Sequence, residues 1–260
     1  MRLYSKYLAI TLKAHLQYPG SFFLLTISQT LFPLSMLVGV HGLFLRFGRL
    51  GDWTFPEVAL CFGVIHLVFG LSECFSRGFD SFSLLVRNGE FDRLLVRPQS
   101  TVVQVLGSRF EFNRIGRLLQ GLLVLGWALL NADVAWSVAK GVTVALMIIS
   151  GYCLFTGFFI LQATMSFWTI QGLEVGNILV DGGRELAQYP LSIYKDWVVR
   201  FFTWIIPLGS INYLPLLFLL DRSEGVALGH MLSPLVGVLF LIPCLLVWQL
   251  GVKHYQSTGS

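Results

Sequence analysis

The chain has 260 residues, of which 55% are apolar and 12% are charged, and its mean hydropathy is +0.72. Soluble domains carry about a quarter charged residues, so this composition excludes an ordinary water-soluble protein and indicates an integral membrane protein. The net charge of +4 fits the Lys and Arg residues that orient a membrane protein, and it gives no reason to expect a nucleic-acid partner.

The N-terminal arm, residues 1–20, predicts a basic amphipathic helix that lies in the plane of the lipid headgroups. At about 100° per residue, its Lys and Arg residues gather within one arc, and apolar residues such as Leu8 lie opposite. This is the pattern of an interfacial helix, and Pro19–Gly20 would end it. A solvated arm is the alternative interpretation.

Residues 21–252 hold six apolar stretches that predict membrane-crossing helices, each of which needs about 20 residues. These stretches are Ser21–Leu45, about Phe55–Ser72, about Asn113–Ala132, Gly141–Leu173, Phe201–Leu220 and Gly225–Val252. The third would begin with Arg114 and Arg117 reaching out to the interface, and the fourth is long enough to continue beyond the membrane. The expected fold class is an all-α membrane protein with six transmembrane helices and both termini on one side.

The distribution of Lys and Arg predicts which side faces the cytoplasm. With the N-terminus inside, fourteen of the 18 fall in the inner segments, and the remaining four fall in the outer loops. Cytoplasmic loops of membrane proteins carry this excess of positive charge. We therefore expect cytoplasmic termini, a cytoplasmic tail at 253–260, and functional segments in the two long inner loops, about 83–100 and about 174–200.

The inner loop at about 83–100 predicts a short amphipathic helix at the membrane surface. Asn88–Gly89 is a turn signal, and Glu90 and Asp92 then stand in the first turn of a helix, where carboxylates complement the helix dipole. Pro98 ends the element, because the residue before a proline disfavours helix. A helix with one apolar face and one basic face suits docking into a groove on another protein. A solvated loop is the alternative.

Two inner segments carry motifs of one known family. Residues 88–98 read Asn-Gly-Glu-Phe-Asp-Arg-Leu-Leu-Val-Arg-Pro, and residues 183–194 read Gly-Arg-Glu-Leu-Ala-Gln-Tyr-Pro-Leu-Ser-Ile-Tyr. The second motif is followed at 206–215 by Ile-Pro-Leu-Gly-Ser-Ile-Asn-Tyr-Leu-Pro. In this order, with six expected spans and an inside N-terminus, they resemble the six-span ABC-2 family of bacterial ABC transporter permeases over nearly the whole chain.

The resemblance implies an export permease subunit that crosses the bacterial inner membrane several times and works as a dimer, with a second copy or with a sister permease. It also implies a separate cytoplasmic ABC ATPase that binds ATP and Mg²⁺, so this chain is expected to hold no cofactor and to be no enzyme itself. The sequence contains no P-loop of the form G-x-x-x-x-G-K-[ST]. The loop between the second and third spans would enter a groove of that ATPase. The resemblance assigns the contact to Gly89, Glu90, Phe91, Asp92, Arg93, Leu94, Leu95, Arg97 and Pro98.

The segment at about 174–200 has two interpretations. In the functional interpretation, the segment is a second inner contact or a substrate gate, formed by Arg184, Glu185, Tyr189 and Pro190. In the structural interpretation, these residues only set the turn geometry and anchor the chain at the membrane interface, where Tyr and Trp gather.

Polar residues inside the predicted spans are further candidates. His66 lies within the second span, and Glu73 follows two turns later near its inner end. An ionisable residue inside a membrane indicates a functional site by default, and here the role would be in a proton relay or in contact with a substrate. A neutral, hydrogen-bonded His66 and a Glu73 close to water are the alternative. Asn212 would either line a pathway or form a hydrogen bond across helices.

Two other functional classes stay open on the residues alone. An ion-coupled carrier would place its site in broken helices of two related halves, and the sequence shows no internal repeat. An intramembrane enzyme would need paired polar residues at one depth, for which His66 is a start. No His, Cys and carboxylate residues stand at metal-ligand spacing, so no metal site is expected.

Overall fold

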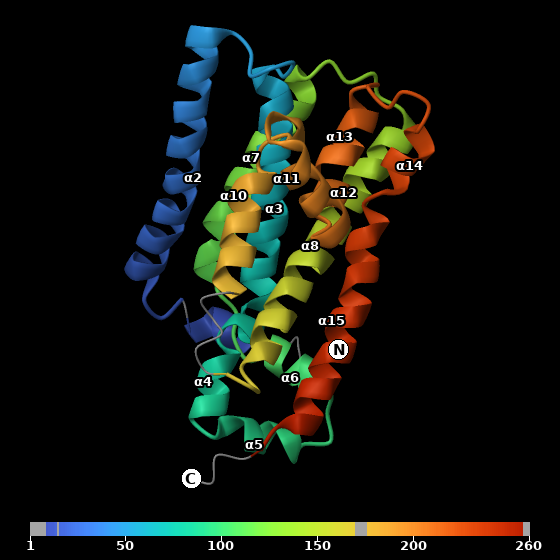
Figure 1. Ribbon diagram of the computed structural model, residues 1–260. Coiled ribbons are helices and arrows are strands. Elements are labelled where there is room, and N and C mark those ends of the chain that lie inside the picture. Colours follow the sequence, from blue (N-terminus) through green and yellow to red (C-terminus); the bar gives the residue numbers. More distant parts are fainter. Residues whose placement is uncertain (1–8, 15, 170–175, 257–260) are drawn as a thin grey trace.

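Long helices run side by side between two ends of the molecule in the computed structural model, which describes residues 9–14, 16–169 and 176–256 (Figure 1). The five longest helices are α2 Pro19–Phe47, α3 Phe55–Asp80, α7 Ile115–Asn131, α8 Val138–Met165 and α15 Leu235–His254. We call the end where α2 stops and α3 starts the upper end. The opposite end, the lower end, carries three short helices, α4 Phe82–Arg87, α5 Glu90–Leu95 and α6 Thr101–Leu106.

The second half of the chain is more broken. A π-helical turn, η2 Ile178–Gly182, leads into α10 Gly183–Ala187, which lies beside α3. The short elements that follow are η3 Leu191–Ile193, α11 Asp196–Arg200, η4 Phe201–Ile205, α12 Leu208–Ile211, α13 Tyr213–Leu219 and α14 Ala227–Leu232. Figure 1 shows α11, α13 and α14 towards the upper end. A 3-10 turn, η1 Phe112–Arg114, precedes α7.

The helices confirm an all-α membrane protein. Within the described residues, α2, α3, α8 and α15 are long and apolar enough to cross a membrane. Residues 196–205 and 208–219 are each too short to cross alone; together they are long and apolar enough, but they bend by 78° between the two halves. The count of six spans therefore stays a prediction.

The predicted fifth span, Phe201–Leu220, is broken. The chain breaks at Ile206 and Pro207, where proline removes a backbone donor and clashes with a continuing helix. The fourth predicted span corresponds to α8, whose 28 residues exceed the about 20 that a crossing needs; the helix ends at Met165, and residues 166–168 form a turn. Residues 170–173 of that predicted extension lie outside the described residues.

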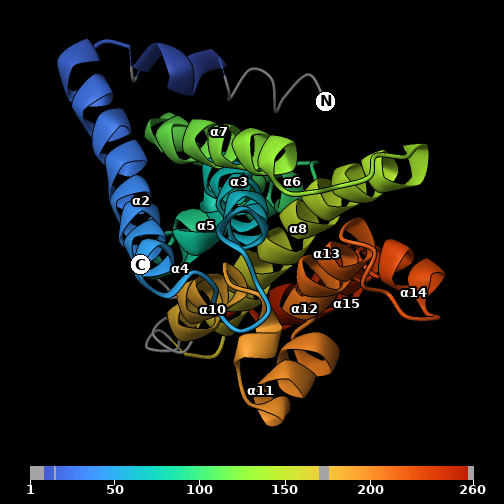
Figure 2. The same cartoon turned by 90° about the horizontal axis from the view of Figure 1, so that it is seen from above.

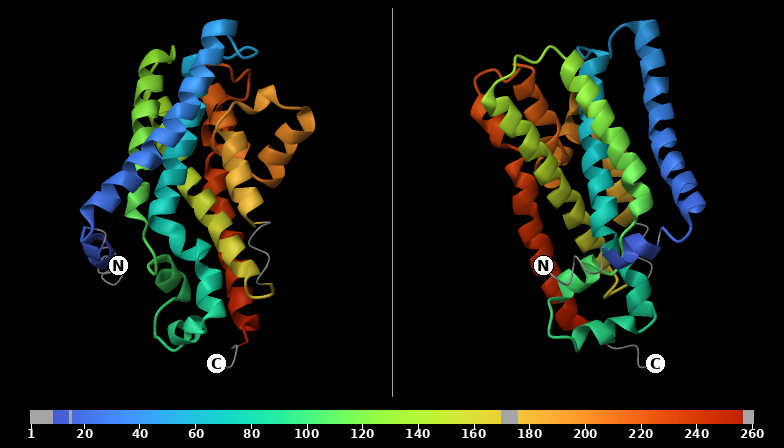
Figure 3. Two further views of the ribbon diagram at one scale, coloured as in Figure 1. Left: turned by 90° about the vertical axis from the view of Figure 1, so that its left-hand side faces the viewer. Right: turned by 180° about the vertical axis from the view of Figure 1, so that it is seen from behind.

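Helix α3 is the central element. In its apolar 18-residue stretch, 89% of the residues are buried. The corresponding value is 11% for α2, which lies at the edge of the bundle (Figures 2 and 3). The contact between α3 and α7 brings their backbones together at glycines. A Cβ on Gly121 of α7 would lie 2.5 Å from the Leu67 backbone nitrogen, and one on Gly63 of α3 would lie 2.7 Å from that of Leu125. Small residues of this kind let membrane helices approach closely.

Gly121→Val is expected to force α3 and α7 apart and to lower the melting temperature by about 5–10 °C, because two helix backbones cannot yield as a flexible side chain can. Gly126→Val is the matched control on the same helix, since no described atom lies within 4 Å of the Cβ position at Gly126. Thermal unfolding of both purified variants measures the difference. Equal melting temperatures would contradict the close α3–α7 contact.

Both described ends of the chain lie at the lower end (Figure 3). The ring of Tyr255, directly after α15, lies 5.0 Å from that of Phe91 in α5. Of the predicted interfacial helix, residues 9–14 are helical, whereas 1–8 and 15 lie outside the described residues, as do 257–260 of the predicted tail. Pro19 begins α2 instead of ending the arm, in the first helical position where proline fits.

The predicted inner segment 174–200 does not lie at one end of the molecule. Residues 174 and 175 are outside the described residues, and η2–α10 then rises beside α3 towards the upper end. There Trp53 Nε1, between α2 and α3, donates a hydrogen bond of 2.8 Å to Ser192 Oγ. Tyr189 and Pro190 therefore lie far from α5, towards the upper end, and their part in a second inner contact or a gate stays a prediction. Lys195 and Arg200 also lie towards the upper end. The excess of Lys and Arg on the predicted inner side is therefore smaller than expected, but it stays on that side.

Candidate functional site

The segment from α4 to α6 is the first candidate site. Gly89 has φ +66° and stands in the left-handed region, which glycine adopts without strain, and this turn lets α5 start at Glu90 in a new direction after α4. On the far side, Gln104 of α6 donates from Nε2 to the backbone oxygen of Leu94 over 3.0 Å. The predicted short helix is therefore present, and it is tied to its neighbours at both ends.

Phe91 anchors α5 to the bundle. Its side chain is fully buried, and its ring centroid lies 4.9 Å from that of Phe82, 5.6 Å from that of Phe167 and 6.4 Å from that of Trp248. Perpendicular and tilted aromatic pairs at such distances are favourable. The expectation that Phe91 itself contacts a partner is wrong, because its side chain faces the core. It positions α5 instead.

The outward face of the same segment is mixed in character. Its exposed members are Glu90, Arg93, Leu95, Val96, Arg97 and Pro98, and we call this set the α5 surface. Val96 is 84% exposed and Leu95 39%. Asp92 lies partly buried near the Tyr255 hydroxyl, and partial burial together with this carboxylate raises the pKa of Tyr255.

A cluster of charges inside the lower half of the bundle is the second candidate. Glu73 of α3 is nearly buried and forms a short ion pair with Arg117 of α7. Arg77 Nη1 lies 3.6 Å and Arg114 Nη1 3.5 Å from Glu73 Oε1. On α2, Gln29 Oε1 accepts hydrogen bonds of 3.0 and 3.2 Å from Arg114 and Arg117. The cluster thus joins α3 to α7 through Glu73 and to α2 through Gln29.

This arrangement corrects one expectation. Arg117 does not reach the interface, since it is buried and pairs with Glu73. Three guanidinium groups surround Glu73, and the alternative that it lies close to water stays a prediction. A polar cavity of about 210 Å³ lies beside the cluster, and Asp181 and Arg184 from η2 and α10 complete its wall.

His66 belongs to a separate network at the middle of α3. Its Nε2 lies 3.1 Å from Gln188 Oε1, and Gln188 donates from Nε2 to Glu185 Oε2 over 2.7 Å. Glu185 also pairs with Arg184. His66 and Glu73 therefore have different partners, and a relay between these two stays a prediction. Asn212 is buried and donates to the backbone oxygens of Cys61 and Ala187, which is the hydrogen bond across helices that the sequence allowed.

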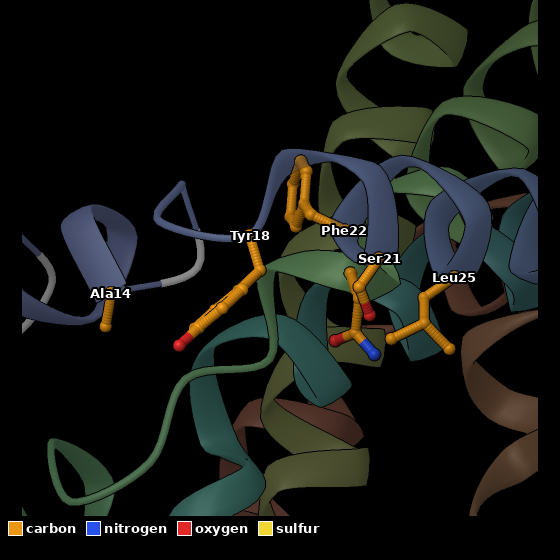
Figure 4. A pocket seen from close by; sticks show the side chains of 6 residues that line it. Ala14, Tyr18, Ser21, Phe22 and Leu25 are labelled. Carbon is orange, nitrogen blue, oxygen red and sulfur yellow. The ribbon is translucent and has the colours of Figure 1, made fainter.

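The sequence analysis missed three residues of these networks: Gln29, Gln188 and Asp181. The only sequence signal for them was a polar residue within or beside an apolar stretch, and neutral amides inside spans are too common for that signal to select them. A further cavity, of about 290 Å³, lies where the arm meets α2 and is lined by Tyr18, Ser21 and Asn113 among apolar neighbours (Figure 4). None of its six lining residues is charged, so it provides no acid, base or ion-pairing group for a ligand.

Comparison with known proteins gives one match. A family model described as "ABC-2 family transporter protein" matches residues 30–259, which covers the helices from within α2 to beyond α15. No curated protein and no solved structure matches the chain.

Proposed function

Because the chain belongs to the ABC-2 family of transporter proteins and is a multi-pass membrane protein with a transport role, we propose that it is the permease subunit of an exporter and that the α5 surface binds a separate cytoplasmic ABC ATPase. The lower end is then the cytoplasmic end. ATP and Mg²⁺ bind to the ATPase, and this chain forms the path across the inner membrane together with a second copy or a sister permease.

The observation that carries the proposal is the form of the α5 segment. It presents exposed apolar side chains between two exposed arginines, at the end of the bundle and outside the apolar length of the spans. An exposed apolar patch rimmed by charges is typical of a protein contact. On the side of α5 that faces the core, Phe91 packs against Trp248 of α15 and against Phe167 in the turn after α8. Movement of the α5 surface would therefore be transmitted to α15 directly and to α8 through the turn that follows it.

The excess of positive charge supports the proposed orientation. In the described part of the chain, more Lys and Arg residues lie in the lower half of the bundle or beside it than at the upper end. The nine lower residues are Lys13, Arg77, Arg87, Arg93, Arg97, Arg109, Arg114, Arg117 and Lys253, and the six upper ones are Arg46, Arg49, Lys140, Lys195, Arg200 and Arg222. Membrane proteins keep such residues on the cytoplasmic side. An ATPase, which needs cytoplasmic ATP, would then find the α5 surface on its own side of the membrane.

The double variant Leu95→Asp/Val96→Asp is expected to reduce co-purification of the ATPase at least tenfold, because central apolar contacts of an interface carry most of its affinity. The tagged permease is co-expressed with each ABC ATPase of its genome that lacks membrane spans, and the captured ATPase is quantified. Val226→Asp is the control, since Val226 is 56% exposed but lies at the upper end. If the double variant retains the ATPase as well as the control does, the α5 surface is not the contact.

A further inference from the structure

An apolar cavity of about 550 Å³ lies towards the upper end, beside the bent pair formed by residues 196–205 and 208–219. One wall consists of α11 and η4, another consists of α14, and the rest comes from α12, α13 and the start of α15. Figure 2 shows α11 and α14 apart from each other, with α12 and α13 between them. The size is that of pockets that bind small organic molecules.

The cavity lies beside a segment that is suited to the membrane. Together the two halves of the bent pair are long and apolar enough to cross it, and the break at Ile206 and Pro207 joins them. On the same segment Trp204, which lines the cavity, is 82% exposed, and Ile205 is 67% exposed. Exposed Trp residues are typical of the boundary between lipid and water. A ligand that dissolves in the bilayer therefore has access to this part of the protein.

Arg200 gives the cavity a positive charge. It is the only Lys, Arg, Asp or Glu residue in the lining, and within the described part of the chain its guanidinium forms neither an ion pair nor a hydrogen bond. Asp196 precedes it by one turn and Glu224 lies before α14, but neither lines the cavity or pairs with Arg200. His230 also lines the cavity and adds no negative charge in either of its protonation states. The charge that faces this space is therefore positive and uncompensated.

Thr203 adds a hydrogen-bond donor to the same wall. It follows Arg200 by three residues on the continuous stretch from α11 to η4, and both residues line the cavity. Thr203 is only 7% exposed, and its hydroxyl has no hydrogen-bond partner among the described residues. A buried hydroxyl without a partner costs free energy, which a ligand oxygen in the cavity would recover.

We infer that this cavity binds an amphipathic anion, whose apolar body fills the space and whose carboxylate or phosphate meets Arg200 and Thr203. Hydrogen bonds from a guanidinium to such an oxygen are charge-assisted and stronger than neutral ones. A cation is disfavoured, because no carboxylate lines the cavity to receive it. The inference goes beyond the proposed function, since it requires neither an ATPase nor a particular orientation in the membrane.

The test uses two photoactivatable probes with one apolar chain and opposite charges, a diazirine derivative of palmitic acid and the corresponding alkylamine. The purified full-length permease is irradiated in nanodiscs of zwitterionic lipid, and mass spectrometry quantifies labelling of residues 199–214 and 226–236. The acid is expected to label these residues about tenfold more than the amine does, and Arg200→Gln to remove this difference. Lys195→Gln, an exposed cation outside the lining, is the matched control. Equal labelling by both probes, or unchanged labelling of Arg200→Gln by the acid, overturns the inference.

Gly229→Leu supplies a second readout that involves no charge. Gly229 lines the cavity and no described atom lies within 4 Å of the Cβ position there, so a leucine side chain takes up space without disturbing the core. It is expected to abolish labelling by the acid, whereas Gly126→Leu, equally open but on α7, should not. Retained labelling in Gly229→Leu overturns the inference.

Competition identifies the source of the anion. Displacement of the probe by excess unlabelled palmitate indicates a free carboxylate, and displacement by phosphatidylglycerol in the nanodisc indicates a lipid phosphate; either result supports the inference. Labelling that neither competitor displaces is non-specific and overturns it. None of these results depends on ATPase association, so a failed co-purification experiment leaves this test intact and the reverse also holds.

Discussion

Glu73→Gln is expected to lower the free energy of unfolding by about 3–5 kcal/mol, the usual cost of removing one partner from a buried ion pair. Arg117 bears most of the effect. The neighbouring arginines have other carboxylates, since Arg77 Nε lies 3.1 Å from Asp80 Oδ2 and Arg114 Nε lies 3.1 Å from Glu111 Oε2. Arg117 would keep only the Gln29 amide and the face of the Phe69 ring among the contacts the structure gives it. A melting temperature lower by about 10 °C checks the loss.

A double-mutant cycle shows whether the loss comes from the orphaned charge. Arg117→Met alone is expected to cost less than Glu73→Gln, because Glu73 keeps Arg77 and Arg114 as partners. The double variant should be more stable than Glu73→Gln alone, since it removes the unpaired charge. If instead the two losses add, the two side chains are independent and the buried pair does not explain the stability of this region.

The sequence was most informative where a single physical rule applies. Twenty or more uncharged residues predict a membrane helix, and α2, α8 and α15 follow that rule. The turn at Asn88–Gly89 and the short helix after it also follow from local chemistry, and α5 starts at Glu90 as expected. Local signals of this kind do not depend on the rest of the fold.

The sequence misled where depth in the membrane depends on tertiary packing. Residues 183–187 contain Arg184 and Glu185 and therefore looked like an inner loop, yet they form α10 beside the centre of α3. The two charges are accommodated there because they pair with each other and with Gln188. Gln188 in turn lies within hydrogen-bond distance of His66 of α3. Hydropathy along the sequence does not contain such a contact between helices. The same reason explains why Arg117 seemed to belong to the interface.

The orientation of Phe91 is a related case, because a helix of six residues has no long periodicity from which to choose its buried face. Phe91, Leu94 and Leu95 all fit one apolar face on spacing alone. In the structure only Phe91 is fully buried, whereas Leu95 is 39% exposed. The choice is made by the aromatic residues that surround Phe91, and these come from segments far along the chain, including Phe167 and Trp248.

Phe91→Ala is therefore expected to release α5 from the bundle while leaving every side chain of the α5 surface in the chain. Replacing a buried Phe by Ala costs about 3–5 kcal/mol, and a loss of that size, taken up by local opening, raises cleavage of the opened segment by roughly a hundredfold or more. Limited trypsin digestion with mass spectrometry reports cutting after Arg93, whereas Arg97 is followed by Pro98 and is not a trypsin site. Phe23→Ala is the control, since Phe23 is 59% exposed on α2.

ATPase association separates positioning from direct contact in the same variants. If Phe91 only holds α5 in place, Phe91→Leu, which keeps an apolar side chain in the core, should restore both trypsin resistance and co-purification of the ATPase. Phe91→Ala should lose both, because a mobile α5 presents its arginines and Val96 in no fixed arrangement and must be ordered on binding. Trypsin cleavage of Phe91→Ala at the rate of the Phe23→Ala control would show that other contacts hold α5, and the aromatic anchor would then have no part in transmitting movement to α15.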